Sequence, residues 1–395
     1  MGDGVRAEQL TAALLAIALL ALGGGVARAE PYLAVRFGAK CADCHTNLDG
    51  GGKRTSFATI HAHDILHDLQ ILPLPKGVQS FNGEINQWIS IGSDLRVRST
   101  SSWADTPNAQ GRVPMNRAFR DVFQSETLNV QEALGYLQVD LWPDVLSLYG
   151  DFNAAGGGVT ARETVAIVHL PFNTFFKGGR FFPPFGLRVF EDASFIRSNT
   201  GFTFQNPFEG GEAGIVQGPF YLATSVTNAS SGGGSSGSGT SSSKNVLTSV
   251  NGYGMFEDVP VVRNVLAGGS FAHQSTQRNV SAFYAGSNIW QFTYLGEFDL
   301  IDDTTALPAN TNTGRDQFAS YAEVDWLLFN WLNLRGTFDF LKVSGNRNQT
   351  RYQIGAEPFI DKFIQPRLYY VINNGPGNQP QQNTTALIFE LHFFF

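Results

Sequence analysis

The only two cysteines of the 395-residue chain are Cys41 and Cys44, and His45 follows them directly. Two cysteines separated by two residues and followed by a histidine form the attachment motif of a c-type haem. In such a site the two thiols form thioethers with the haem vinyl groups, and the histidine binds the iron from one face. The motif therefore predicts one covalently bound haem c, held by Cys41, Cys44 and His45.

Two other uses of a cysteine pair fit the sequence less well. A structural zinc site takes four ligands, and the chain has no second pair of cysteines. A disulfide or a thioredoxin-like redox motif belongs in a βαβ context, and it would leave the adjacent His45 as a coincidence.

The second axial ligand of the iron is less clearly marked than His45. Three further histidines follow within one short segment, and they are His61, His63 and His67. Of the methionines, Met1 belongs to the export signal, while Met115 and Met255 lie far along the chain. The sequence therefore favours bis-histidine ligation or an open position over methionine ligation. His63 is the preferred candidate, because it shares a face with His67 on a helix predicted over 56–70.

A run of three glycines, residues 50–52, follows the haem motif and leads into Lys53 and Arg54. Because glycine has no Cβ, this turn can pass close to the edge of a porphyrin. Lys53 and Arg54 are then expected to pair with the haem propionates. The alternative is a flexible turn that carries a solvated basic pair.

An export signal precedes the haem motif. Arg6 lies in a short first segment, an apolar run covers about residues 10–22, and Ala-Arg-Ala at 27–29 forms a cleavage site. The run is too short to span a bilayer, so residues 1–29 are expected to be a signal peptide cleaved near Glu30. Residues 30–76 are expected to form the haem-binding segment. They are too few to bury a core of their own, and we expect them to lean on, or plug, the domain that follows.

Residues 77–395 show the alternation of half-buried strands, most clearly at the end of the chain. There, one face carries Glu390 and His392, and the other is entirely apolar. The apolar face consists of Leu387, Phe389, Leu391, Phe393 and Phe395. Apolar-out, polar-in alternation is typical of a transmembrane β-barrel, and a terminal phenylalanine resembles the signal recognised by the outer-membrane assembly machinery.

The expected fold is an all-β outer-membrane barrel of about sixteen antiparallel strands, an even number as in other bacterial barrels. The strands are expected to start near residues 83, 127, 145, 161, 175, 211, 219, 246, 262, 278, 290, 316, 331, 349, 364 and 384. Tight turns alternate with longer polar loops at 103–120, 187–210, 229–244, 302–315 and 373–383, which are expected outside the cell. Aromatic residues near the tight turns are expected to form an interfacial girdle, namely Trp142, Trp290, Trp331, Phe359 and Phe363.

Composition restricts the partners of this chain. The formal net charge is −7, and charged residues make up 15% of the sequence without a basic run, which argues against nucleic acid. A soluble β-sandwich or solenoid would expose the apolar strand faces to water and aggregate. Charges of both signs fall on the expected lumen face. They suit a lumen closed by ion pairs or a plug as well as they suit a selective pore.

Together, a signal peptide, one Cys-x-x-Cys-His motif and a barrel of about sixteen strands resemble the outer-membrane monohaem cytochrome–porin fusions. The specific resemblance is confined to residues 31–57. The positions that match the spacing of that family are Pro31, Phe37, Cys41, Cys44, His45, Gly52, Arg54 and Phe57. The resemblance implies electron conduction across the outer membrane, and ferrous iron as a substrate.

The leading functional hypothesis is electron transfer by one haem between a periplasmic carrier and an extracellular donor or acceptor. The expected partners are therefore a periplasmic electron carrier, an extracellular redox partner or metal ion, and the lipid of the outer membrane. One alternative is a porin whose haem segment serves periplasmic docking or sensing. Another is a haem enzyme, such as a peroxidase, with an open distal site.

Overall fold

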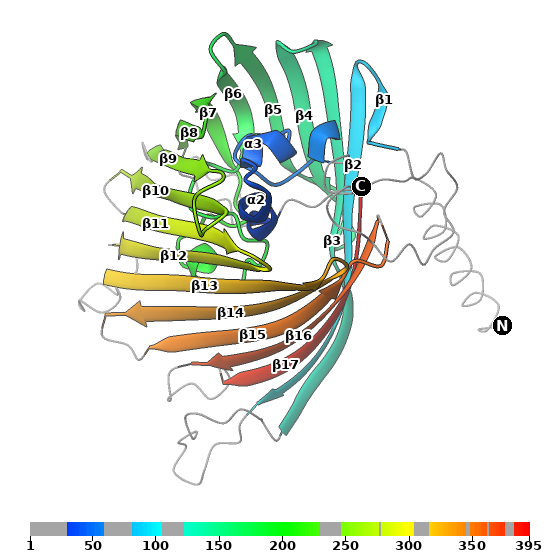
Figure 1. Cartoon of the computed structure of the whole chain (residues 1–395), viewed down its shortest axis with the longest axis vertical. Helices are drawn as coiled ribbons and strands as arrows, with labels where there is room; N and C mark the ends of the chain where they lie inside the picture. Colours follow the sequence, from blue (N-terminus) through cyan, green and yellow to red (C-terminus); the bar gives the residue numbers. More distant parts are fainter. Residues whose placement is uncertain are drawn as a thin grey trace, which may run out of the picture.

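The computed structural model describes residues 30–58, 81–104, 122–228, 246–275, 278–303, 316–344, 348–361, 363–375 and 383–395. The predicted signal peptide, Met115 and the histidines His61, His63 and His67 lie outside these residues. Sixteen long strands, β2 to β17, form a closed antiparallel barrel, in which each strand pairs with the next and β17 pairs with β2 (Figure 1). A short strand, β1, pairs with the beginning of β2. The predicted all-β barrel of sixteen strands is confirmed.

The strands are β1 (Glu84–Asn86), β2 (Ile89–Ala104), β3 (Val122–Trp142), β4 (Leu146–Asn153), β5 (Thr160–Leu170), β6 (Thr174–Phe181), β7 (Phe208–Gln217), β8 (Phe220–Asn228), β9 (Val246–Phe256), β10 (Asn264–Gln274), β11 (Arg278–Ile289), β12 (Phe292–Asp303), β13 (Asp316–Phe329), β14 (Leu332–Val343), β15 (Gln349–Pro358), β16 (Ile364–Asn374) and β17 (Thr384–Phe394). Each of the sixteen predicted starts lies within six residues of the start of a barrel strand. Alternating polarity and turn residues were sufficient to place them because every strand has one face in the lumen and one in lipid.

The last strand shows how this alternation is satisfied. On β17, Leu387 and Phe389 are exposed on the outer surface, while Glu390 and His392 are buried in the lumen. The barrel closes through the pairing of β17 with β2. Beyond the strand, the backbone of Phe395 exchanges two hydrogen bonds of 3.0 Å with Ser93. The predicted division of this segment into an apolar and a polar face is confirmed.

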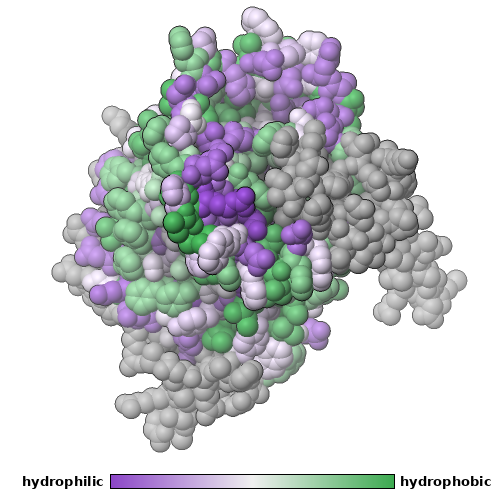
Figure 2. All heavy atoms as spheres, in the orientation of Figure 1, coloured by the Kyte–Doolittle hydropathy of each residue, from purple (hydrophilic) through white to green (hydrophobic). Residues whose placement is uncertain are grey.

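Apolar side chains that point away from the lumen form the outer belt expected of a membrane barrel. They include Leu128, Leu148, Phe176, Phe220, Leu222, Val226, Phe271, Phe283, Phe298, Leu300, Ile354, Leu368, Leu387 and Phe389. Figure 2 shows green hydrophobic side chains over the outside of the wall and purple hydrophilic ones gathered at the mouth that holds α2 and α3. Trp142 and Trp290 are exposed near short turns, as predicted. Phe359 is only 5% exposed and packs inward, so its predicted place in the girdle is wrong.

In the described ranges, the helices with defined bounds are α2 (Pro31–Phe37), α3 (Cys41–Cys44) and α6 (Phe195–Ser198), all of them short. Among the described residues, no helix is both long and apolar enough to cross a bilayer. Helix α2 begins with proline at its first position, where no hydrogen bond to the amide is needed. It ends at Gly38, whose φ of 71° reverses the chain. A Cβ there would lie 2.5 Å from Cγ of Glu257.

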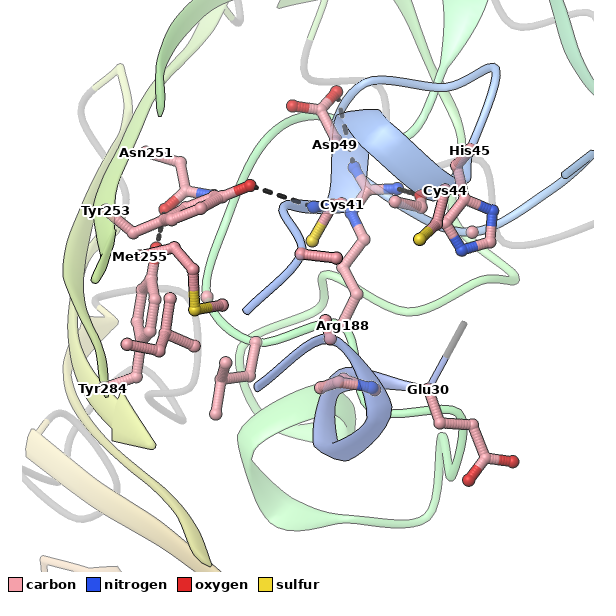
Figure 3. A pocket seen from close by; sticks show the side chains of 18 residues that line it. Glu30, Cys41, Cys44, His45, Asp49, Arg188, Asn251, Tyr253, Met255 and Tyr284 are labelled. Atoms are coloured by element: carbon pink, nitrogen blue, oxygen red, sulfur yellow. Dashed lines mark hydrogen bonds and ion pairs between the residues drawn. The ribbon is translucent and has the colours of Figure 1, made fainter. Parts of the chain in front are cut away.

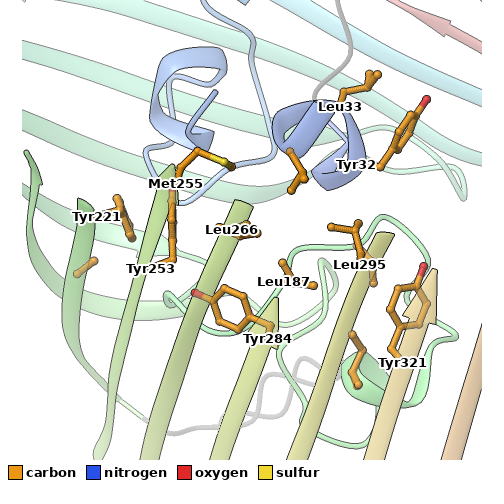
Figure 4. Packing of buried hydrophobic residues seen from close by; sticks show 14 of the residues in the cluster. Tyr32, Leu33, Leu187, Tyr221, Tyr253, Met255, Leu266, Tyr284, Leu295 and Tyr321 are labelled. Carbon is orange, nitrogen blue, oxygen red and sulfur yellow. The ribbon is translucent and has the colours of Figure 1, made fainter. Parts of the chain in front are cut away.

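The N-terminal segment 30–58 lies inside the barrel (Figure 1), where α2 packs against β10, β11 and β12. The wall at this place is unusually apolar for a barrel lumen, which is polar in most members of this class. We call this wall the apolar lumen patch, and it consists of Tyr253, Met255, Leu266, Tyr284 and Leu295 (Figure 4). Tyr32 and Leu33 of α2 belong to the same buried cluster. Burial of this segment therefore comes from the barrel wall and not from a core of its own.

The loop between β6 and β7 also enters the lumen. Its residues Phe185, Leu187 and Ile196 are buried, and the backbone N–H of Gly186 donates a 2.8 Å hydrogen bond to Oγ of Ser270 on the wall. This loop therefore joins β6 to β7 at the barrel end of the other long loops, as predicted, but it folds into the lumen and does not extend into water. The loop is too apolar to remain in water, and the lumen wall supplies partners for its backbone.

Candidate functional site

The cysteines and His45 belong to a compact hairpin-like turn. Cys41 and Cys44 are the first and last residues of α3, and the backbone N–H of His45 donates to the carbonyl of Cys41 at 3.0 Å. His45 then pairs with Arg54 as an isolated β-bridge. The chain between these two residues doubles back, and it places the haem motif beside the glycine run.

The three glycines of that run are required by its conformation. Gly50, Gly51 and Gly52 have φ angles of 92°, 79° and 68°, which side-chain-bearing residues rarely adopt. A Cβ on Gly50 would lie 3.2 Å from the Cβ of Cys41, and one on Gly52 would lie 2.1 Å from the hydroxyl of Tyr149. The run therefore allows the turn to fit closely between α3 and the wall.

Cys41, Cys44 and His45 line one cavity between this turn, the inward loop and the barrel wall (Figure 3). The two sulfur atoms point into the same space. The other residues that line it are Glu30, Pro31, Ala34, Ala39, Asp49, Gly50, Gly51, Gly186, Leu187, Arg188, Asn251, Tyr253, Met255, Leu266 and Tyr284.

Hydrogen bonds and ion pairs fix the turn to the wall. The N–H of Cys41 donates to the hydroxyl of Tyr253 at 3.2 Å. The ammonium of Lys177 on β6 lies 2.7 Å from a carboxylate oxygen of Asp49 and 2.9 Å from one of Glu212. Because these charged groups are almost completely buried, loss of one partner would leave an unpaired charge in the interior. The position of the cysteines relative to the wall is therefore well defined.

The environment of the thiols also bears on what they can do. Burial raises the pKa of Cys41, and burial raises the pKa of Cys44 to about 12. Cysteines that act as nucleophiles or exchange disulfides have lowered pKa values, and both thiols here are free. The site therefore offers little support for the thioredoxin-like alternative.

A second cavity lies on another side of His45. His45, Glu30 and Arg188 line both cavities, and the second one is also lined by Arg54 and His392. The Nε2 atom of His392 lies 3.0 Å from a carboxylate oxygen of Asp94. Guanidinium groups at the junction of the two cavities provide a place for acidic groups of a ligand.

The predicted basic pair is divided by the structure. Arg54 lines the second cavity, and its guanidinium lies 4.7 Å from the ring centre of Phe394. The ammonium of Lys53 donates instead to the carbonyl of Arg54 at 3.0 Å, and this side chain lines a different cavity with Glu84 and Asp140. Burial lowers the pKa of Lys53 to about 8. Lys53 is therefore not placed beside the cysteines, and Arg188 is.

Sequence reasoning missed two residues of this cavity. Arg188 belongs to the loop expected outside the cell, and Met255 was set aside because it lies far from the haem motif along the chain. The structure places both in the cavity that the two thiols line. The inward face of β9 holds both Tyr253 and Met255, and this alternation was the available signal. Distance along the chain says nothing about distance across a closed barrel.

The residues present fit a c-type haem. Two thiols and one imidazole, which is the donor set of that group, face one cavity. An apolar wall borders the cavity within a lumen that is otherwise lined with charge. The three histidines proposed for the sixth position lie outside the described residues.

Comparison with known proteins tests the fold. No protein-family model and no curated protein matches the sequence. Among solved structures, the high-pH structure of OprB from Pseudomonas putida matches with a TM-score of 0.57 and 9% identity, covering 78% of this chain and 94% of that one. This chain has the fold of an outer-membrane porin.

Two other outer-membrane proteins have a similar fold. The outer-membrane channel DcaP of Acinetobacter baumannii has a TM-score of 0.54 and 9% identity, covering 78% of this chain and 97% of that one. A loop L8 deletion mutant of OmpT from Vibrio cholerae has a TM-score of 0.52 and 10% identity, covering 78% of this chain and 99% of that one. The porin-like chain is therefore an outer-membrane protein, as its sequence predicts.

Proposed function

We propose that this porin-like protein transfers electrons through one covalent haem in its lumen. Cys41 and Cys44 would attach the haem, and His45 would be its first axial ligand. The observation that carries the proposal is the cavity inside the barrel that all three residues line. When bound, the haem supplies a one-electron redox couple.

The position of α3 supports access from the periplasm. Lys40 and Asp43 line an open depression together with Asp144, Asn173 and Gly218, which belong to the short turns of the barrel. In outer-membrane barrels the short turns face the periplasm. A periplasmic electron carrier could therefore approach α3 directly from that side.

The opposite side of the lumen supports access from outside the cell. A further cavity near the long-loop ends of the strands is lined by Arg98, Glu191, Arg351 and Asn374. A haem held between these two openings is closer to the outer surface than one on a free periplasmic appendage. This arrangement favours electron transfer between the two sides over the docking or sensing alternative.

The residues of this chain would bind and shield the group. Arg188 and Arg54 offer guanidinium groups to acidic substituents, while the apolar lumen patch excludes water from one wall. Glu30 pairs with Arg335 and Arg367, which holds the start of the segment in the lumen. These contacts keep the attachment site at a constant position between the two openings.

A solute channel is the alternative that the fold comparisons favour, because the similar structures include an outer-membrane channel. The inward loop and the segment 30–58 both occupy the lumen, and ion pairs between neighbouring strands, such as Arg98 with Glu390 at 2.8 Å, line its wall. Conductance of the purified protein in a planar bilayer separates the two functions. We expect conductance well below that of an open porin.

The main test is expression in a host that matures c-type cytochromes, followed by a haem stain of a denaturing gel. We expect a stained band from the outer membrane, and its loss in the Cys41→Ala/Cys44→Ala double variant. The double variant should still migrate differently before and after boiling, which shows that the barrel is folded. An unstained wild-type band would refute covalent attachment.

Electron transfer is tested after reconstitution into vesicles that enclose a reducible dye. An external reductant should reduce the dye in vesicles with wild-type protein and leave it oxidised with the double variant. A stained protein that does not reduce the dye would favour docking or sensing over transfer.

A further inference from the structure

We infer that Met255 supplies the second axial ligand of the iron, opposite His45. This inference rests on the proposed function, since it requires the covalent haem. It replaces the sequence-based preference for a histidine of the segment that follows the motif.

The register of the barrel fixes Met255 in the lumen. Met255 is the penultimate residue of β9 and is 4% exposed, while the next residue, Phe256, is 40% exposed on the outside. The backbone N–H of Met255 donates a 2.8 Å hydrogen bond to the carbonyl of Pro219. It pairs with Leu266 on β10. A slip that turned Met255 outward would reverse every side chain of β9.

Met255 and His45 line the cavity from opposite sides. Two axial ligands approach iron from opposite faces of the haem. In Figure 3, Met255 comes from the barrel wall on one side, His45 lies on the other, and Cys41 and Cys44 lie between them. The thioether of methionine is an established axial ligand of haem iron in cytochromes.

Other side chains of this cavity with ligand-class atoms are already engaged. The hydroxyl of Tyr253 accepts the hydrogen bond from the N–H of Cys41, and that of Tyr284 donates to Oδ1 of Asn251 at 2.5 Å. Asp49 is paired with Lys177. Among the lining residues the thioether of Met255 is the ligand-class atom that can bind iron without the loss of such a contact.

The histidines elsewhere in the described part of the chain are placed less well. His392 lines the second cavity and is paired with Asp94. His169 lines the depressions at the mouth, and His273 bonds to Asn279 at 2.7 Å on β11. Unlike His45, none of these three histidines lines the cavity of the cysteines. His61, His63 and His67 remain as competitors that the experiment must distinguish.

The test compares Met255→Leu with Met115→Leu in the whole protein, purified from the host in which the wild type stains for haem. Leucine keeps the apolar bulk but cannot bind iron, and Met115 is the matched control because it is the other methionine beyond the signal peptide. We expect wild type to show the low-spin spectrum and ferric charge-transfer band of methionine ligation. Met255→Leu should lose both, bind carbon monoxide in the ferrous state and have a lower reduction potential. Met115→Leu should match wild type.

A second variant and a second measurement keep the test decisive. Met255→His should restore a low-spin spectrum of the bis-histidine type, whether or not Met255→Leu assembles well. In wild-type protein labelled at the methionine methyl groups, the ferrous state should show one methyl resonance shifted far upfield by the haem ring. That observation requires no variant at Met255.

Three outcomes would overturn the inference. A Met255→Leu spectrum identical to wild type would exclude Met255, and alanine variants of His61, His63 and His67 would then identify the ligand. A high-spin wild type would indicate an open position. Absence of the shifted methyl resonance would exclude any methionine ligand. If instead the wild-type band does not stain for haem, the proposed function itself has failed.

Discussion

Glu30 forms an ion pair with Arg367 of β16, 337 positions further along the chain. Arg335 of β14 binds the other carboxylate oxygen. The sequence predicts Glu30 as the first residue after cleavage of the signal peptide, so this pair would hold the very start of the exported chain inside the lumen. Segment 30–58 is thus a part of the barrel interior and not a periplasmic appendage.

Glu30→Gln should loosen this segment. Removing one partner of a buried ion pair leaves the other charges uncompensated, typically at about 3–5 kcal/mol. Arg335 and Arg367 retain Glu357 and Glu390 at 2.9 and 3.1 Å, so we expect the lower end of that range. Limited proteolysis should cleave the segment faster in Glu30→Gln, but not in the exposed control Glu84→Gln. Equal cleavage rates would mean that other contacts hold it.

The buried ion pair of Asp49 and Lys177 should contribute to docking of segment 30–58 about as much as the ion pairs of Glu30 do. Asp49→Asn and Lys177→Met should each weaken docking of the segment, by about 3 kcal/mol. The double variant should lose less than the sum of the two single losses, because each single variant leaves a buried charge unpaired. Additive losses in a double-mutant cycle would contradict a direct coupling between them.

Acid should release the same contact. Burial alone would raise the pKa of Asp49, but Lys177 and Arg188 outweigh burial and hold this pKa below its ordinary value. The stabilisation is therefore complete above the unfolded-state pKa of about 4, and it is lost as pH falls through the lower folded-state pKa. Docking of segment 30–58, as measured by limited proteolysis, should persist at pH 5 and weaken in stronger acid. Asp49→Asn should remove this part of the pH dependence.

Lys53→Met should stabilise docking at neutral pH and leave the haem attached. Burial lowers the pKa of Lys53 from 10.5 to about 8, so the folded state disfavours its charge by about 3 kcal/mol. The unfolded chain binds the proton more tightly, and stability should therefore rise with pH between about 8 and 10.5. Methionine should abolish that rise. A variant that loses haem would instead support the predicted pairing of Lys53 with a propionate.

Arg188→Gln should lower the reduction potential. Arg188 lies between the two cavities, and it donates to the carbonyls of Gly50 and Phe182 at 3.2 and 2.7 Å. A nearby positive charge favours the reduced iron, so its removal should lower the potential by roughly 50 mV, about 1 kcal/mol for one electron. A redox-titrated spectrum measures the shift, with Arg278→Gln as a control far from the cysteines. Equal shifts in both variants would argue against a specific role.

The sequence by itself determined the barrel. Strands with one lipid face and one lumen face must alternate in polarity, and a local pattern such as Leu387 to Phe395 records that requirement. It also predicts a haem attachment site at Cys41, Cys44 and His45, because that chemistry depends on spacing within five residues. Both conclusions follow from short-range order along the chain.

Only the tertiary structure decided what surrounds the motif. Closure of the barrel brings β9, β14 and β16 to the same interior as residue 30, so Met255, Arg335 and Arg367 meet a segment whose first residue is more than 200 positions away. The inward loop carries Arg188 to the same place from a distant part of the chain. No local pattern encodes such contacts, because they depend on which strands face each other across the lumen once all sixteen are paired.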